Sequence, residues 1–125
     1  MEVVRKQVGG SVVLKPVGRI DMTTAEPFRA QLLAALGDLA APPAAVVIDC
    51  AHLDYVSSAG LRAVMVAAKE AKGRGLGLGV AALQPVVREI FAISRFDLVI
   101  ASFETVRDAF GTLDPGAVEH LAGLP

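Results

Sequence analysis

The sequence of 125 residues contains no tryptophan and a single cysteine, Cys50. One cysteine cannot form an internal disulfide, so a disulfide-stapled secreted scaffold is excluded and a reducing cytosol is favoured. The start of the chain lacks the basic-then-apolar pattern of a signal peptide, and charged residues interrupt every apolar run before it reaches the length of a membrane span. We therefore expect a cytoplasmic protein.

The sequence also lacks an excess of charge of either sign. Lysine and arginine number 12, aspartate and glutamate number 13, and the formal net charge is −1. Nucleic-acid binding normally requires a basic stripe, and attraction to an anionic membrane surface requires a polybasic segment, so neither partner is expected. Hydrophobic residues make up 54% of the chain, which is enough for one domain to build a core without metals or disulfides.

Apolar periodicity and turn residues divide the chain into strands that alternate with helices after an opening hairpin. Gly9-Gly10 suits the two-residue turn of that hairpin. Thr24 is the expected N-cap of the first helix, because this choice places Pro27 in the first turn, where its missing N–H is harmless. The predicted strands are residues 3–8, 11–17, 44–50, 76–82 and 96–101, and the predicted helices are residues 25–37, 58–72, 85–94 and 103–111.

These elements indicate an α/β domain over residues 1–111, with a mixed sheet of four to five strands packed with about four helices. Residues 112–125 are expected to form a C-terminal tail, in which residues 117–121 are the candidate for one helical turn. Gly77 and Gly79 fall on one face of a strand and would let a helix pack closely there. The residues expected to face the core are Leu61, Val64, Met65 and Ala68 in the second helix, Val86, Ile90 and Ile93 in the third, and Phe103, Val106 and Phe110 in the last. Ser102 is the expected N-cap of this last helix, and Gly111 is expected to end it.

Few residues of the sequence suggest catalysis. The glycines of residues 73–79 follow a helix and enter a strand, the reverse of the order in a dinucleotide-binding fingerprint. His52 and His120 have no partners at a metal-ligand spacing and no recognisable triad context around a serine. Cys50 closes a buried strand and is interpreted as an apolar filler. We therefore expect a protein that is not an enzyme and that uses no cofactor or metal.

The most informative stretch leads from a buried strand through a short polar loop into Ser57-Ser58-Ala59-Gly60-Leu61, which opens a helix. The N–H groups of a first helical turn and the helix dipole both favour an anion, such as a phosphate, at this position. The alternative is that Ser57 is simply the N-cap and Ser58 an ordinary residue of the first turn. Gly60 favours a binding role, because glycine in a helix costs up to about 1 kcal/mol relative to alanine and its small size admits another molecule.

One flank of the same helix has the composition of a docking surface. Ser58, Arg62, Met65 and Lys69 recur at helical spacing, with Val66 beside them. A row that mixes a hydroxyl, cations and apolar atoms is more typical of a protein–protein contact than of a plain solvated face. We therefore expect a partner protein to dock on this flank.

The order of the motifs resembles the STAS family, and more narrowly its free-standing bacterial anti-sigma factor antagonists. The resemblance covers residues 3–111 and rests on Gly18-Arg19-Ile20-Asp21 with Thr24-Ala25-Glu26, on Val46-Val47-Ile48-Asp49, and on Tyr55-Val56-Ser57-Ser58-Ala59-Gly60-Leu61. It implies a STAS fold and an antagonist that binds, while unmodified, an anti-sigma factor that is also a serine kinase, so that a sigma factor is released. Phosphorylation by that kinase dissociates the antagonist, and a serine phosphatase resets the switch.

The resemblance also implies particular site residues. The modified serine of the family stands two residues before the Gly-Leu pair, which is Ser58 here, and Asp21 matches an acidic position that the family associates with phosphorylation or nucleotide contacts. Many antagonists carry aspartate directly before the modified serine, whereas this chain has Ser57, which removes a negative charge and is the second candidate for phosphorylation. The alternative function is a non-phosphorylated STAS module that serves a lipid or anion transporter or a larger signalling assembly. The residues expected to bind the partner are Asp21, Thr24, Ser57, Ser58, Gly60, Arg62, Met65 and Lys69.

Overall fold

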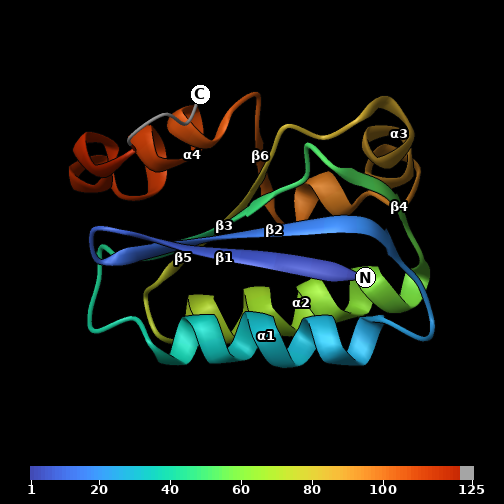
Figure 1. Cartoon of the computed structure of the whole chain (residues 1–125), viewed down its shortest axis with the longest axis horizontal. Helices are drawn as coiled ribbons and strands as arrows, with labels where there is room; N and C mark the ends of the chain where they lie inside the picture. Colours follow the sequence, from blue (N-terminus) through green and yellow to red (C-terminus); the bar gives the residue numbers. More distant parts are fainter. Residues whose placement is uncertain (122–125) are drawn as a thin grey trace.

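A six-stranded mixed sheet forms the centre of the protein in a computed structural model that describes residues 1–121 (Figure 1). The first two strands form an antiparallel hairpin, and the later strands join in parallel pairs. The strands are β1 (Glu2–Val8), β2 (Ser11–Ile20), β3 (Ala45–Asp49), β4 (Leu53–Val56), β5 (Gly77–Ala81) and β6 (Ala101–Phe103). They lie in the order β1-β2-β3-β5-β6, and β4 pairs with the last residues of β2.

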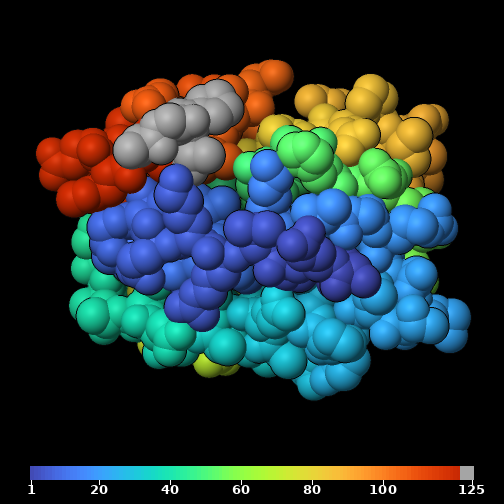
Figure 2. All heavy atoms as spheres, viewed as in Figure 1, coloured from blue at the N-terminus to red at the C-terminus, as the bar shows by residue number. Residues whose placement is uncertain are grey.

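Helices cover both faces of this sheet. Within the described residues they are α1 (Ala25–Gly37), α2 (Ser58–Gly73), α3 (Pro85–Ile93) and α4 (Val106–Leu113), with the 3-10 helices η1 (Phe96–Leu98) and η2 (Pro115–His120). The helices α1 and α2 lie side by side on one face, whereas α4 and η2 cover the other face and α3 packs against β4 (Figure 1). Between α1 and the C-terminal elements, β1 lies uncovered along the front of the molecule (Figure 2). The α/β fold class is therefore confirmed.

Each face of the sheet carries its own apolar core, because neighbouring residues of a strand point to opposite sides. The core under α1 and α2 includes Leu14, Phe28, Leu32, Ile48 and Ala67, and the core under α4 and η2 includes Val13, Val47, Val106 and Phe110. A Cβ added at Gly77 would lie 3.3 Å from the Cβ of Leu113, and one added at Gly79 would lie 2.9 Å from its Cδ1. The prediction that these glycines admit a closely packed helix is therefore confirmed, and the helix is α4.

The polar loop expected before Ser57 contains the strand β4. This strand pairs with the end of β2, where Arg19 lies opposite Tyr55 and the guanidinium carbon lies 4.4 Å from the centre of the tyrosine ring. The expectation of a loop is therefore wrong. The sequence pattern did not reveal the strand, because β4 has only four residues and one of them is the polar Asp54. Its extended conformation comes from pairing with β2, and the sheet gains a sixth strand.

The buried face of α2 differs from the predicted face. The helix buries Gly60, Ala63, Val64, Ala67 and Ala71, whereas Leu61 and Met65 lie at the edge of the core and are only partly buried. The small residues face inward because α1 packs directly alongside α2. The larger side chains, which hydropathy alone would bury, fit only at the edge of this close contact.

In α3 the predicted inward face is wrong for Val86 and Ile93, whereas Ile90 is partly buried and packs against the core as predicted. Val87 and Phe91 are buried, whereas Val86 and Ile93 are 56% and 75% exposed. Phe91 packs edge-on against Phe96 of η1, with ring centroids 5.2 Å apart. The choice between two apolar stripes on this short helix is made by the neighbouring η1, which the sequence pattern does not reveal.

The C-terminal elements are shifted along the chain from their predicted positions. The hydroxyl of Thr105 caps α4 by accepting a hydrogen bond from the N–H of Asp108 at 3.0 Å, whereas Ser102 lies in β6. The helix continues through Gly111, and residues 96–98 form η1 instead of a strand. Within the predicted tail, η2 packs on the sheet and buries Ala117; residues 122–125 lie outside the described residues.

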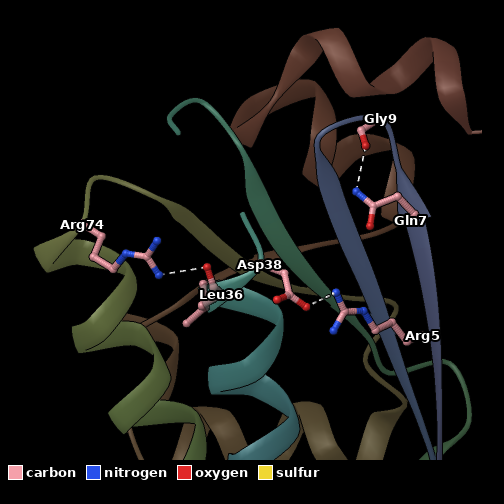
Figure 3. A network of polar contacts seen from close by, with 6 residues as sticks. All are labelled: Arg5, Gln7, Gly9, Leu36, Asp38 and Arg74. Atoms are coloured by element: carbon pink, nitrogen blue, oxygen red, sulfur yellow. Dashed lines mark hydrogen bonds and ion pairs between the residues drawn. The ribbon is translucent and has the colours of Figure 1, made fainter. Parts of the chain in front are cut away.

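Polar contacts tie the elements together where α1 and α2 end. Arg74 donates a hydrogen bond from Nη1 to the carbonyl oxygen of Leu36 at 2.9 Å, and Arg5 forms an ion pair with Asp38 at 2.8 Å (Figure 3). In the same view, Gln7 donates to the carbonyl oxygen of Gly9 at 2.8 Å. These contacts join β1, α1 and α2 at one end of the molecule.

A buried polar cluster lies on the other side of the sheet at this same end. The hydroxyl of Ser11 donates to Oδ2 of Asp114 at 2.6 Å and accepts a hydrogen bond from the N–H of Ala45 at 2.9 Å. Ser11 is fully buried and Asp114 is 8% exposed. The cluster therefore fixes the C-terminal elements to the first residues of β2 and β3. We call this region, made of Arg5, Ser11, Leu36, Asp38, Ala45, Arg74 and Asp114, the anchored end.

Candidate functional site

The opposite end of the molecule carries the serine pair. The parallel strands β2 and β4 end together there, with Ile20 opposite Val56, and the N–H of Ser57 donates to the carbonyl oxygen of Ile20 at 2.8 Å. The turn after β2 and the start of α2 are thus held side by side. We call this region, residues 21–24 and 57–62, the open end.

Ser57 is the N-cap of α2. Its backbone is extended, with φ −84° and ψ 172°, and its Oγ accepts a hydrogen bond from the N–H of Gly60 at 3.2 Å. Its carbonyl oxygen accepts the first helical bond, from the N–H of Leu61 at 2.9 Å. The predicted capping role of Ser57 is confirmed. Its hydroxyl is therefore already engaged in a hydrogen bond within the fold.

Ser58 is the first residue of α2 and differs from its neighbour in both exposure and bonding. Its side chain is exposed to solvent, and its hydroxyl makes no hydrogen bond to another of the residues 1–121. No acidic residue lies in the first turn of the helix. A second molecule can therefore reach the Ser58 hydroxyl without first breaking a contact of the fold.

Asp21 organises the neighbouring turn. Its Oδ1 accepts hydrogen bonds from the hydroxyl of Thr23 at 2.7 Å, from the N–H of Thr23 at 2.9 Å and from the N–H of Thr24 at 3.2 Å. These bonds, with the Thr23 hydroxyl as the largest contribution, hold the pKa of Asp21 below its ordinary value. The carboxylate is therefore ionised and directed at the first residues before α1.

Thr24 occupies the predicted N-cap position of α1, but its hydroxyl does not bond forward to the helix. The hydroxyl instead accepts a hydrogen bond from the N–H of Asp21 at 2.9 Å and lies 3.1 Å from the carbonyl oxygen of Arg19, to which it donates. The Asp21 carboxylate satisfies the Thr23 and Thr24 amides that precede the helix. The side chain of Thr24 therefore stiffens the turn after β2, and the expected capping hydrogen bond is absent.

Gly60 has a different role from the one that its position suggests. It is buried, and a Cβ added to it would lie 2.7 Å from Cγ2 of Val56 and 2.8 Å from Cγ2 of Ile20. The interpretation of this glycine as space for an incoming molecule is therefore wrong. Its small size lets α2 begin directly on top of the paired ends of β2 and β4.

A shallow groove runs between the first turns of α1 and α2. Its volume is about 250 Å³, and one wall comes from α1 and the turn before it, whereas the other wall comes from α2. Met22 at its rim is 86% exposed and Val66 is 39% exposed. The residues that line this α1–α2 groove are Met22, Ala25, Glu26, Arg29, Ala59, Arg62, Ala63 and Val66. Sequence reasoning missed the α1 wall, because only the packing of the two helices brings it beside α2.

The predicted docking flank of α2 is divided between the groove and open solvent. Arg62 and Lys69 are exposed, whereas Met65 is partly buried and packs against the core. Arg62 lines the groove and forms no ion pair with another of the described residues. Across the groove, Glu26 is engaged by Arg29 at 3.0 Å. The surface beside Ser58 thus presents one uncommitted guanidinium amid apolar atoms.

The other residues with potential chemistry lie apart from this site. Cys50 is buried, and desolvation together with the nearby Asp49 raises the pKa of its thiol to about 12, which is consistent with an apolar filler. The ring of His120, the last residue of η2, lies so close to Gly9 that a Cβ added there would be 2.8 Å from its Cδ2. Among residues 1–121 no cluster of side chains could hold a metal ion, and no helix combines the length and the apolarity needed to cross a membrane.

Comparison with known proteins agrees with this geometry. Residues 2–109 match the family model of the STAS domain, and the chain belongs to the STAS domain family. Its curated relatives include the anti-sigma-F factor antagonist RsfB of Mycobacterium tuberculosis, which is 32% identical over 112 residues that span 89% of this chain and 88% of RsfB. The resemblance inferred from the motifs is confirmed at the level of the family.

Solved structures of anti-sigma factor antagonists share the fold. The crystal structure of one from Mycobacterium paratuberculosis is 25% identical, has a TM-score of 0.75 and aligns over 90% of this chain and 92% of that chain. The unphosphorylated form of SpoIIAA is 17% identical, has a TM-score of 0.69 and aligns over 99% of each chain. The phosphorylated form of SpoIIAA from Bacillus is 18% identical, has a TM-score of 0.65 and aligns over 88% of this chain and 97% of that chain. The fold is therefore one that solved antagonist structures also adopt.

Proposed function

We infer that this protein is a regulatory anti-sigma factor antagonist of the cytoplasm. In its unmodified state it binds an anti-sigma factor that is also a serine kinase, and phosphorylation of Ser58 releases it. The observation that carries this inference is the contrast between two adjacent hydroxyls, one bonded within the fold and one free at the surface. Membership of the STAS family and the antagonist RsfB among the relatives support the same assignment.

The bonding of the serine pair favours Ser58 as the modified residue. A kinase must bring the acceptor hydroxyl in line with the phosphoryl group, and Ser58 is exposed with no bond to break. Modification of Ser57 would remove the hydrogen bond to Gly60 and place a bulky group at a half-buried cap. Ser57 is therefore the second candidate.

The proposed reaction adds charge where the fold tolerates it. The kinase transfers the terminal phosphoryl group of ATP to Oγ of Ser58, the hydroxyl proton passes to a base of the kinase or to water, and ADP leaves. The phosphate carries about −1.5 to −2 charges at neutral pH. A helix N-terminus accommodates such a group, whereas an interface closed over it would be opposed by desolvation and repulsion. A serine phosphatase would restore the binding state by hydrolysis.

The docking surface that we propose combines the serine with the features beside it. It includes Ser58, Arg62, Lys69 and the exposed apolar rim of the α1–α2 groove, Met22 and Val66. Asp21, Thr24 and Gly60 act here mainly by holding the turn and the helix start in place. A partner with apolar side chains and an acidic group fits this surface best, because Arg62 has no acidic partner among residues 1–121.

Mass spectrometry after incubation with ATP and the cognate anti-sigma factor kinase tests the proposal. The wild type is expected to gain one phosphate on Ser58, and Ser57→Ala is expected to gain it as well. Ser58→Ala should bind the kinase but remain unmodified, because it lacks the acceptor oxygen and keeps the other residues of the docking surface. Normal phosphorylation of Ser58→Ala would assign the reaction to Ser57 and refute our assignment.

Co-purification from cells tests the class of partner independently of the modified residue. Recovery of a soluble kinase that releases a sigma factor is the expected result. Recovery of a membrane permease or transport ATPase, with no kinase, would refute the antagonist function and support a transporter-associated STAS module.

A further inference from the structure

We propose that Arg62 exchanges partners when Ser58 is phosphorylated. In the unmodified protein it is available to an acidic group of the docking protein, and in the modified protein it holds the Ser58 phosphate. The inference rests on the proposed function and identifies the residue that couples the modification to the docking surface. Arg62 takes no part in the phosphoryl transfer itself and acts by pairing with the phosphate once it has formed.

Helix geometry brings the two side chains together. Ser58 and Arg62 are one turn apart in α2, so their Cβ atoms are separated by about 5–6 Å. Side chains of a helix lean toward its N-terminus and cover the preceding turn. From this position the side chain of Arg62 can reach back toward the first turn of α2, where Ser58 presents its hydroxyl.

The groups around Arg62 leave it available for a phosphate. It is exposed and forms no ion pair within the described part of the chain. Glu26, the carboxylate that lines the same groove, is held by Arg29 at 3.0 Å, and the carboxylate of Asp21 accepts its hydrogen bonds from Thr23 and Thr24. A dianionic phosphate is therefore the strongest acceptor within reach of Arg62, and guanidinium groups bind phosphate oxygens in a bidentate geometry.

Through this exchange, a single phosphorylation would change the docking surface in two ways. The phosphate introduces negative charge at Ser58, and its pairing with Arg62 removes the cation that an acidic partner group would contact. The acidic group then loses an attractive contact and gains a repulsive one at the same place. Without Arg62, phosphorylation would act by repulsion and desolvation alone.

Titration of the phosphate measures the pairing directly. Phosphoserine is introduced at position 58 during synthesis of the full chain, and its second ionisation, ordinarily near pH 6, is followed by phosphorus NMR. We expect the phosphate pKa to be lower in the wild type than in Arg62→Gln by about 0.3 units or more, because a nearby cation favours the dianion. Lys69→Gln removes an exposed cation three turns from Ser58 and should titrate like the wild type.

A high-salt titration separates ion pairing from a change of structure. The difference between wild type and Arg62→Gln should shrink at 1 M salt, where the screening length falls to about 3 Å. Equal phosphate pKa values in the wild type and Arg62→Gln at low salt would overturn the proposal. So would a difference that Lys69→Gln reproduces in full.

Binding to the kinase then tests the regulatory consequence. Arg62→Gln should weaken binding of the unmodified protein and reduce, by about threefold or more, the factor by which phosphorylation weakens it further. An unchanged factor would overturn the exchange. If the kinase leaves Ser58 unmodified although the titration depends on Arg62, the proposed function fails. If the kinase modifies Ser58 and the titration does not depend on Arg62, only this inference fails.

Discussion

The anchored end and the open end of the molecule differ in how their polar groups are used. At the anchored end, Ser11, Asp114 and Arg74 bond to other parts of the fold, and the first two are buried. At the open end, Ser58 and Arg62 are exposed and make no side-chain contact of this kind within residues 1–121. The same helix, α2, links the two ends, with Ser58 at its start and Arg74 just beyond its last residue.

We infer from this difference that the proposed docking surface lies apart from the buried hydrogen bonds that stabilise the fold. Buried hydrogen bonds contribute to the free energy of unfolding, because a broken one leaves a desolvated polar group. Exposed side chains without partners contribute little to that free energy and are free to contact a second molecule. Substitutions at the anchored end should therefore change stability, and substitutions at the open end should change binding.

The largest effect is expected from Ser11→Ala at the anchored end. The change leaves the Asp114 carboxylate and the N–H of Ala45 buried without their shared partner, so the free energy of unfolding should fall by about 3 kcal/mol. Urea denaturation measures the fall. Ser58→Ala is the matched control and should change this free energy by less than about 0.5 kcal/mol. Similar losses in both variants would contradict the separation of the two ends.

Gly60→Ala should destabilise the protein although Gly60 belongs to the open end, because this glycine is closely packed. The added methyl group meets Val56 and Ile20 at less than 3.0 Å, and such overpacking costs about 1–3 kcal/mol. Thermal or urea denaturation detects this loss. In Gly111→Ala, where nothing lies within 4 Å of the added Cβ, stability should stay equal or rise by up to about 1 kcal/mol. A neutral Gly60→Ala would refute the steric role of this glycine.

Two arginine substitutions, one at each end of the molecule, should have smaller effects on the free energy of unfolding. Arg74→Gln removes the hydrogen bond to the carbonyl oxygen of Leu36 and should lower the free energy of unfolding by about 1 kcal/mol. Arg62→Gln removes an exposed cation with no partner in the described residues and should leave stability unchanged within about 0.5 kcal/mol. Parallel urea denaturation of both variants gives the comparison. A larger loss for Arg62→Gln would show that Arg62 serves the fold.

The smallest effect concerns the pH dependence of the turn after β2. The pKa of Asp21 is lowered in the folded protein, chiefly by the Thr23 hydroxyl, so the folded state favours the ionised carboxylate. The stabilising contribution is therefore present above the ordinary pKa of about 4 and is lost as the pH falls through the lowered value. Carbon NMR of the carboxyl group should show a higher pKa in Thr23→Ala than in the wild type. No change would mean that the Thr23 hydroxyl does not stabilise the charge.

The sequence predicted those features that depend on neighbouring residues in the chain. Ser57 was identifiable as the cap and Ser58 as the first helical residue, because hydroxyl side chains and the following apolar pattern define a helix start locally. The hairpin at Gly9-Gly10 and the family motifs are equally local. The general α/β order followed from the alternation of these local patterns.

Features that depend on packing between distant segments were not predictable in this way. The role of Gly60 depends on Ile20 and Val56, which come from two other elements. The α1–α2 groove requires Met22 and Arg29 to lie beside α2, and the sequence gives no sign of that contact. For the same reason the two possible apolar faces of α3 could not be distinguished.

The position of the buried Ser11–Asp114 pair, at the end of the molecule remote from Ser58, has an evolutionary consequence. Duplicated copies of such a gene could accumulate changes around the α1–α2 groove without losing the bonds that hold the fold together. Each copy could thereby come to recognise its own partner while remaining folded. A domain arranged in this manner can diversify into parallel signalling routes that remain insulated from one another.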